Sequence, residues 1–203
     1  MLFYDSVGPN PRMVRMFMAE KGFDVPKATV DIRGGENRQA EYLAKNPSGQ
    51  TPALALDNGS ILAEITAICE YVDEVGNGPS LIGATPEERA ETRMWTRRID
   101  LNIVEPGAGG FRSAEGLKMF QNRIRCIPHA AEDLKLVAKE NLAKLNAQMA
   151  GKTYVCGERL TMADILLFAF VDFFNNVGQK LDPANTNIAA WFERMKARPS
   201  AAA

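Results

Sequence analysis

The spacing of hydrophobic and polar positions changes about one third of the way along the chain. In the first 76 residues, short apolar runs that are typical of strands alternate with apolar positions at helical spacing. Strands are predicted at residues 2–4, 28–32, 53–56 and 60–62, the last two around a hairpin turn at 57–59. Helices are predicted from Pro11, near Glu36 and near Glu64. The predicted order is therefore βαβαββα.

The start of the first helix is predicted from two neighbouring residues. Asn10 is a favourable N-cap, because its side chain accepts a hydrogen bond from a free N–H of the first turn. Pro11 would then be the first helical residue, where the missing N–H has no intrahelical partner.

Beyond a segment rich in Gly and Pro at 77–86, the strand signals nearly vanish. Helical patterns continue to residue 150, with interruptions predicted at 106–110 and near Pro128. The most apolar run, 165–171, is much too short to cross a bilayer and is predicted to be a buried helix. The chain thus divides into an α/β domain at 1–76, a linker at 77–86 and an all-α domain at 87–203.

Composition narrows the class of protein. The 203 residues are 46% hydrophobic and 24% charged, with a net charge of −1, which is ordinary for a soluble globular protein. This charge favours neither nucleic acid nor a membrane as a partner. The three cysteines are odd in number and lack CxxC spacing, so we expect a reducing compartment, the cytoplasm, and no metal site. No secretory signal is expected at the N-terminus.

Five segments, spread over nearly the whole chain, carry a resemblance to a known family. They read PNPRMVRMFMAEKG, VDIRGGENRQAEYLAKNPSGQTPAL, NGSILAEITAICEYVDE, ERLTMADI and WFERMKARPS. The chain resembles the cytosolic glutathione transferases, and most of all the bacterial and fungal subfamily whose first helix reads PNPRRVR. This resemblance implies a thioredoxin-like domain that binds glutathione as co-substrate, a helical bundle domain that binds an electrophile, and a homodimer.

The resemblance also implies a glutathione site. Gln50, Thr51 and Pro52 match a segment in which a cis peptide at Thr51–Pro52 turns the Thr51 main chain toward the cysteinyl part of glutathione. Glu64 and the N–H of Ile65 match the positions that bind its γ-glutamyl end at a helix N-terminus. Ile65 replaces the usual hydroxyl residue, and Thr66 follows it.

Further positions match those that bind the glycine carboxylate of glutathione in related classes. They are Asn37, Arg38 and Gln50. Arg38 is the best charged candidate, because a guanidinium group matches a carboxylate with two parallel hydrogen bonds. An exposed surface role for Arg38 is the alternative.

The reaction requires a thiolate, whereas a cysteine-type thiol has a pKa of about 8.5. Lowering it by two units takes roughly 2.7 kcal/mol, which a helix N-terminus and one donor can supply. The family usually places Tyr, Ser or Cys beside the sulfur, but this stretch contains no Cys. Asn10 is the first candidate for this position and Ser6 the second, with Tyr4 and His129 as alternatives.

The electrophile is expected to contact the first helices of the second domain. Ile103, Phe111 and Met119 are the candidate wall residues. The leading functional hypothesis is conjugation of glutathione to hydrophobic electrophiles. The alternatives are a glutathione-dependent peroxidase, a thioether-cleaving enzyme, or a protein of this fold that binds ligands or partners without catalysis.

Overall fold

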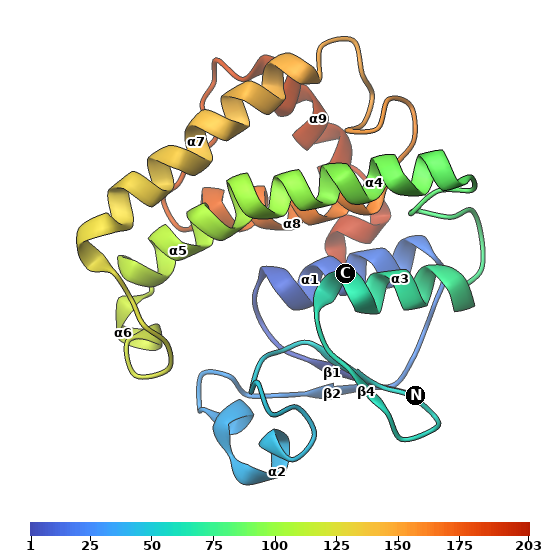
Figure 1. Ribbon diagram of the computed structural model, residues 1–203, viewed down its shortest axis with the longest axis vertical. Helices are drawn as coiled ribbons and strands as arrows, with labels where there is room; N and C mark the ends of the chain where they lie inside the picture. Colours follow the sequence, from blue (N-terminus) through green and yellow to red (C-terminus); the bar gives the residue numbers. More distant parts are fainter. The chain divides into compact units, whose positions relative to one another are not determined.

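The strand signals of the first third form one four-stranded sheet (Figure 1). Its strands are β1 (Leu2–Asp5), β2 (Lys27–Thr29), β3 (Ala53–Ala55) and β4 (Ile61–Leu62), in the order β2-β1-β3-β4. β1 is parallel to β2 and antiparallel to β3, and β3 is antiparallel to β4. A parallel pair requires a crossover, and α1 (Pro9–Glu20) provides it. The predicted thioredoxin-like order is confirmed.

Two helices cover one face of this sheet, and the short helices lie on the other side (Figure 1). α1 packs against α3 (Ile65–Val75), and both bury apolar side chains at helical spacing. Phe17 and Ile68 are fully buried between these layers. The short helices are η1 (Glu36–Arg38) and α2 (Ala40–Leu43).

The predicted start of α1 is wrong by two residues. The helix begins at Pro9, Gly8 is the N-cap residue, and Asn10 makes no capping hydrogen bond. Pro9 and Pro11 both lack an N–H, so either residue suits the first position of a helix, where an N–H would have no intrahelical partner. Gly8 has φ 120°, a conformation that glycine adopts without the steric cost of a side chain.

The computed structural model describes residues 1–203, which fall into two units. The first contains Met1–Ala84 together with Pro199–Ala203, and the second contains Thr85–Arg198. The regular elements of the second are all helices, and its loops contain two isolated bridges. Its elements are α4 (Pro86–Ile99), the π-helical turn η2 (Asp100–Val104), α5 (Glu105–Ser113), α6 (Leu117–Phe120), η3 (Pro128–Ala130), α7 (Ala131–Gln148), α8 (Met162–Asn176) and α9 (Thr186–Lys196). The final turn, η4 (Pro199–Ala202), packs on α1.

The interruption predicted at 106–110 occurs earlier. Residues 105–113 are α-helical, and the irregular turn is η2, just before Pro106. Proline has no N–H to donate and its ring collides with the preceding turn, so the helix widens there.

The centre of the second unit is α8, in which the predicted burial of 165–171 is confirmed. Asp164, in its first turn, is fully buried and accepts hydrogen bonds from Val155 N–H, Trp191 Nε1, and both the N–H and hydroxyl of Thr161. Burial raises the pKa of the Asp164 carboxyl, against the opposing effect of these hydrogen bonds.

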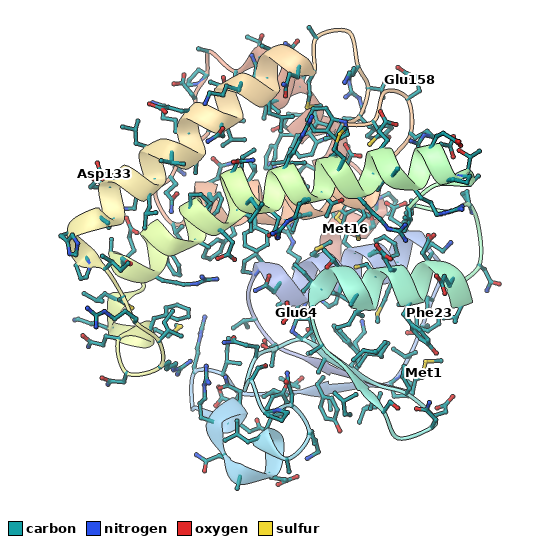
Figure 2. All side chains as sticks on the ribbon, in the orientation of Figure 1. Met1, Met16, Phe23, Glu64, Asp133 and Glu158 are labelled. Carbon is teal, nitrogen blue, oxygen red and sulfur yellow. The ribbon has the colours of Figure 1, made fainter.

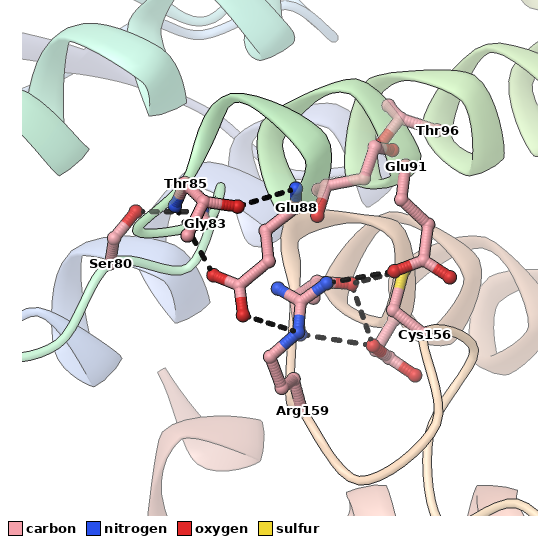
Figure 3. A network of polar contacts seen from close by, with 11 residues as sticks. Ser80, Gly83, Thr85, Glu88, Glu91, Thr96, Cys156 and Arg159 are labelled. Atoms are coloured by element: carbon pink, nitrogen blue, oxygen red, sulfur yellow. Dashed lines mark hydrogen bonds and ion pairs between the residues drawn. The ribbon is translucent and has the colours of Figure 1, made fainter.

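The start of α4 is fixed by a second polar cluster (Figure 3). Thr85 and Glu88 form a capping box, in which each side chain binds the main-chain N–H of the other residue. Arg159 reaches the same turn and forms ion pairs with Glu88 at 3.6 Å and Glu91 at 2.9 Å. The cluster connects the loop before α8 to the first helix of this unit.

The three cysteines are free. Burial raises the pKa of the Cys69 and Cys156 thiols, which makes both poor nucleophiles. None of the helices is long and apolar enough to cross a membrane.

Candidate functional site

The sheet register places Ser6 opposite Thr51. Tyr4 pairs with Ala53, and two residues further along these antiparallel strands Ser6 faces Thr51. Their hydroxyl oxygens are 2.6 Å apart, a short hydrogen bond in which either group can donate. Two residues 45 positions apart in sequence are therefore in direct contact.

The main chain of Ser6 is fixed by an ion pair. The Asp5 carboxylate accepts the Ser6 N–H at 2.8 Å and Arg15 Nη1 at 2.6 Å. Arg15 also donates to the Ser6 carbonyl at 3.2 Å. Ser6 is only 6% exposed, so its hydroxyl is largely removed from water. The loop between β1 and α1 thus holds Ser6 in one position.

Asn10 and Tyr4 lie on either side of this loop. Asn10 is the second residue of α1; it is half-buried, and its amide forms no hydrogen bond within the protein. Its N–H₂ group therefore remains available as a donor. Tyr4 is half-buried in β1, with its ring packed edge-on against Tyr42. His129 is exposed in the second unit.

Thr51 presents a free main-chain edge next to the hydroxyl contact. The Thr51–Pro52 peptide is cis, as the family resemblance implies. Neither the N–H nor the C=O of Thr51 hydrogen-bonds to the protein. A ligand with an extended peptide backbone can therefore pair with this N–H and C=O in the way an added strand would.

The same end of the sheet meets the start of α3. Leu54 pairs with Leu62 in the β3–β4 hairpin, and continuing this register places Pro52 opposite Glu64. Glu64 is exposed and precedes the first residue of α3, Ile65 (Figure 2). The first N–H groups of this helix have no intrahelical partner, and its first turn contains no acidic side chain. An anion would be stabilised at this position.

Glu64 has an unusual main-chain conformation. Its φ of 69° and ψ of 121° make it the one non-glycine residue with a positive φ. Such a conformation costs about 1–3 kcal/mol and is typical of functional sites. The sequence carries no signal for it, because the residue is not a glycine.

The third group of predicted residues surrounds the turn before Thr51. Asn37 is buried and donates from Nδ2 to the Gly49 carbonyl at 2.6 Å, while its Oδ1 has no partner. Arg38 donates from Nη1 to the Ser48 carbonyl at 3.2 Å, and its buried Nε has no partner. The side chain of Gln50 is exposed. Arg38 therefore retains an unused donor, whereas the unused atom of Asn37 is an acceptor.

Two supporting residues were missed by sequence reasoning. Tyr42 donates its hydroxyl to the Gln50 carbonyl at 2.8 Å, and Arg15 donates to the Ser6 carbonyl at 3.2 Å. Burial raises the pKa of the Tyr42 hydroxyl, so it stays a donor at neutral pH. Both residues lie on helices and contact residues eight and nine positions away, in loops that the strand and helix patterns do not describe.

The candidate wall residues of the second unit have three different surroundings. Ile103 is buried and borders a cavity of about 280 Å³ that Trp95 and Lys144 also line. Phe111 is half-buried, and its ring packs edge-on against Phe173 with 4.9 Å between the ring centres. Met119 is 37% exposed on α6.

Comparison with known proteins identifies the family of the chain. The family model described as "Glutathione S-transferase, N-terminal domain" matches residues 7–75, and the one described as "Glutathione S-transferase, C-terminal domain" matches residues 129–199. Glutathione S-transferase 2 of Saccharomyces cerevisiae is 33% identical over 98% of this chain and 87% of its own length.

Two solved structures are similar over the full length. A glutathione S-transferase domain-containing protein of Marinobacter aquaeolei has a TM-score of 0.93 and 36% identity, covering 99% of this chain and all of its own. Gtt2 of Saccharomyces cerevisiae has a TM-score of 0.92 and 31% identity, covering 100% of this chain and 99% of its own. The chain belongs to the glutathione S-transferase family and is a glutathione transferase.

Proposed function

We propose that the first unit binds glutathione across Thr51, the start of α3 and Arg38, and that the bound thiolate attacks a hydrophobic electrophile. The observation that supports this most is the convergence of Ser6, Thr51 and Glu64 at one end of the sheet. A free main-chain edge, a helix N-terminus and a candidate donor to sulfur are brought together there.

Each part of glutathione has a matching group. The N–H and C=O of Thr51 bind the cysteinyl main chain, as an added strand would. Glu64 binds the γ-glutamyl ammonium group, and the N–H groups of Ile65 and Thr66 bind the neighbouring carboxylate. Ile65 lacks a hydroxyl, so this carboxylate relies on main-chain donors.

The glycine carboxylate is bound at the opposite end of the peptide. Arg38, which is half-buried, supplies its guanidinium group, and Gln50 supplies an exposed amide. Asn37 supports the site by holding the Gly49 carbonyl in place.

The thiol is activated without a general base. Hydrogen bonds from the Asn10 amide or the Ser6 hydroxyl, together with the N-terminus of α1, stabilise the thiolate. The thiol proton leaves to water. The sulfur then forms a bond to the electrophilic carbon while the leaving group departs with its electron pair.

We place the chain in the bacterial and fungal subfamily with a PNPRRVR-type first helix, as a cytoplasmic homodimer. Residues 1–76 bind glutathione, residues 77–86 link the domains, and residues 87–203 bind the electrophile with Ile103, Phe111 and Met119 in its wall.

Two measurements test this function. Calorimetric titration of the chain with glutathione is expected to show saturable binding, and an aryl chloride is expected to be conjugated. Asn10→Ala and Ser6→Ala would then assign the donor to sulfur through the loss of kcat. An absence of both binding and conjugation contradicts the proposal, and unchanged turnover in both variants contradicts the assignment of the donor.

A further inference from the structure

We propose that Thr51 takes part in thiol activation through its side chain, as a positioning residue whose hydroxyl donates a hydrogen bond to Ser6 Oγ. This inference rests on the proposed function and assigns a second role to a residue whose main chain anchors glutathione. The Thr51 hydroxyl acts through Ser6 and does not itself touch the sulfur.

The Ser6 hydroxyl has two hydrogen-bond partners within the protein, of very different length. A serine hydroxyl has one proton to donate and two lone pairs that accept. Its oxygen lies 2.6 Å from Thr51 Oγ1 but 3.3 Å from its other partner, the Val7 carbonyl. When Thr51 donates across the short contact, the Ser6 proton has only this long, weak acceptor. A thiolate is a much better acceptor, so the proton is ready to be donated to it.

The Ser6–Thr51 pair is preorganised. Ser6 is 6% exposed, and its main chain is held by Asp5 and Arg15 through contacts of 2.6–3.2 Å. Thr51 precedes β3, which pairs with β1. The two hydroxyls therefore meet without a rearrangement, and the burial of Ser6 limits the competition of water for its hydroxyl.

The Ser6–Thr51 pair lies where the sulfur of glutathione would be bound. The free N–H and C=O that would bind the cysteinyl group belong to Thr51 itself. The sulfur of that group is therefore held beside the residue that contacts Ser6. A chain from Thr51 to Ser6 to the thiolate polarises each hydrogen bond and strengthens the last one. Both hydroxyls keep their protons throughout, and the thiol proton leaves to water.

The test is Thr51→Val, which replaces the hydroxyl with a methyl group and keeps the side-chain branching. The measured quantity is the pKa of enzyme-bound glutathione, from thiolate absorbance as a function of pH. We expect this pKa to rise by about half a unit, equal to about threefold less thiolate below the pKa. The dissociation constant of S-methylglutathione, which has no thiol, is expected to stay within about twofold, because the main-chain contacts remain.

Two further variants separate a positioning role from a structural one. Thr51→Ser restores a hydroxyl and is expected to return the thiol pKa to that of the wild type. Thr29→Val makes the same substitution at an exposed position of β2 and is expected to leave it unchanged. In the double variant Ser6→Ala, Thr51→Val, the thiol pKa is expected to equal that of Ser6→Ala alone, since Thr51 acts through Ser6.

The outcomes distinguish this inference from the proposed function. If Ser6→Ala raises the thiol pKa and Thr51→Val does not, the inference is overturned and the function stands. Additive effects in the double variant also overturn it. A wild-type chain that fails to bind glutathione overturns the function itself.

Discussion

At the scale of single residues, the site depends on which polar atoms remain unpaired. The sequence predicts Arg38 as a carboxylate contact, but only the structure shows that its Nε is buried without a partner while Nη1 is already used. Likewise, the identity of Thr51 follows from the family segment, whereas its contact with Ser6 does not, because 45 residues separate the two. Local patterns contain no information on such contacts.

Replacing Arg38 tests the glycine-carboxylate site. Arg38→Lys keeps the charge but removes Nε and the planar pair of donors. We expect KM for glutathione to rise about tenfold with kcat nearly unchanged, because the contact is made equally in ground and transition states. Steady-state kinetics would measure both parameters. Arg33→Lys, at a nearby exposed position, is the control and is expected to leave KM unchanged; a loss confined to kcat would contradict this assignment.

Asp164 predicts a pH dependence of stability. Burial raises its pKa, so the folded chain holds this proton to a higher pH than the unfolded chain, whose aspartate pKa is about 3.9. The stability from this group is therefore fully present below the unfolded pKa and decreases as pH rises through the folded pKa.

Asp164→Asn removes this titration but also leaves donors of Thr161 without an acceptor. We expect a free energy of unfolding about 1–3 kcal/mol lower near neutral pH. The difference in free energy of unfolding between the wild type and Asp164→Asn is expected to be larger at acid pH, because only the wild type gains stability there. Urea unfolding across this pH range would measure it, with exposed Asp133→Asn as the control. A difference that shrinks toward acid pH would be the contrary result.

At the scale of elements, the hydrophobic pattern predicts which segments are helices and strands, and their order. The pattern predicts helix boundaries wrongly where a glycine or proline is compatible with more than one local structure. The glycines at 107–110 are typical of a break, but in α5 they allow other elements to approach the helix closely. The pattern also places the α1 start at Pro11, because either proline suits a first helical position.

Two adjacent glycines of α5 provide a matched pair of substitutions. A Cβ at Gly110 would lie 2.9 Å from the Ala131 carbonyl and 2.6 Å from Lys135 Cγ, so α7 would have to move. A Cβ at Gly109 would be 3.4 Å from Leu134 Cδ1, an ordinary contact. We expect Gly110→Ala to lower the free energy of unfolding by about 1–3 kcal/mol. Gly109→Ala is expected to raise it by up to about 1 kcal/mol, through helix propensity. Equal effects in thermal unfolding would contradict the packing argument.

A buried ion pair connects α1, α3 and the segment after α3. Lys21 Nζ lies 3.2 Å from Asp73 Oδ1 and also donates to the Gly78 and Pro79 carbonyls, while Asp73 accepts the Leu81 N–H. Lys21→Met leaves Asp73 buried without its counter-charge. We expect a loss of about 3–5 kcal/mol in the free energy of unfolding.

A double-variant cycle isolates the pair. Because removing both partners leaves no unpaired buried charge, Lys21→Met with Asp73→Asn should cost less than the sum of the single variants. Additive losses in urea unfolding would show that the ion pair itself is unimportant.

At the scale of the whole molecule, the sequence predicts the fold class and the family, because both depend on patterns and segments spread over the full length. The full-length structural similarity to proteins of the same family confirms this. The oligomeric state leaves no such pattern. We expect sedimentation velocity to give twice the 22.3 kDa mass of the chain; a single species at the monomer mass would contradict the proposed homodimer.

The central claim is that the first unit binds glutathione and stabilises its thiolate. The most direct measurement is the absorbance of the bound thiolate during a pH titration of the glutathione complex. The account predicts a thiol pKa about two units below the usual value of about 8.5. A bound thiol that titrates at its ordinary pKa would contradict it.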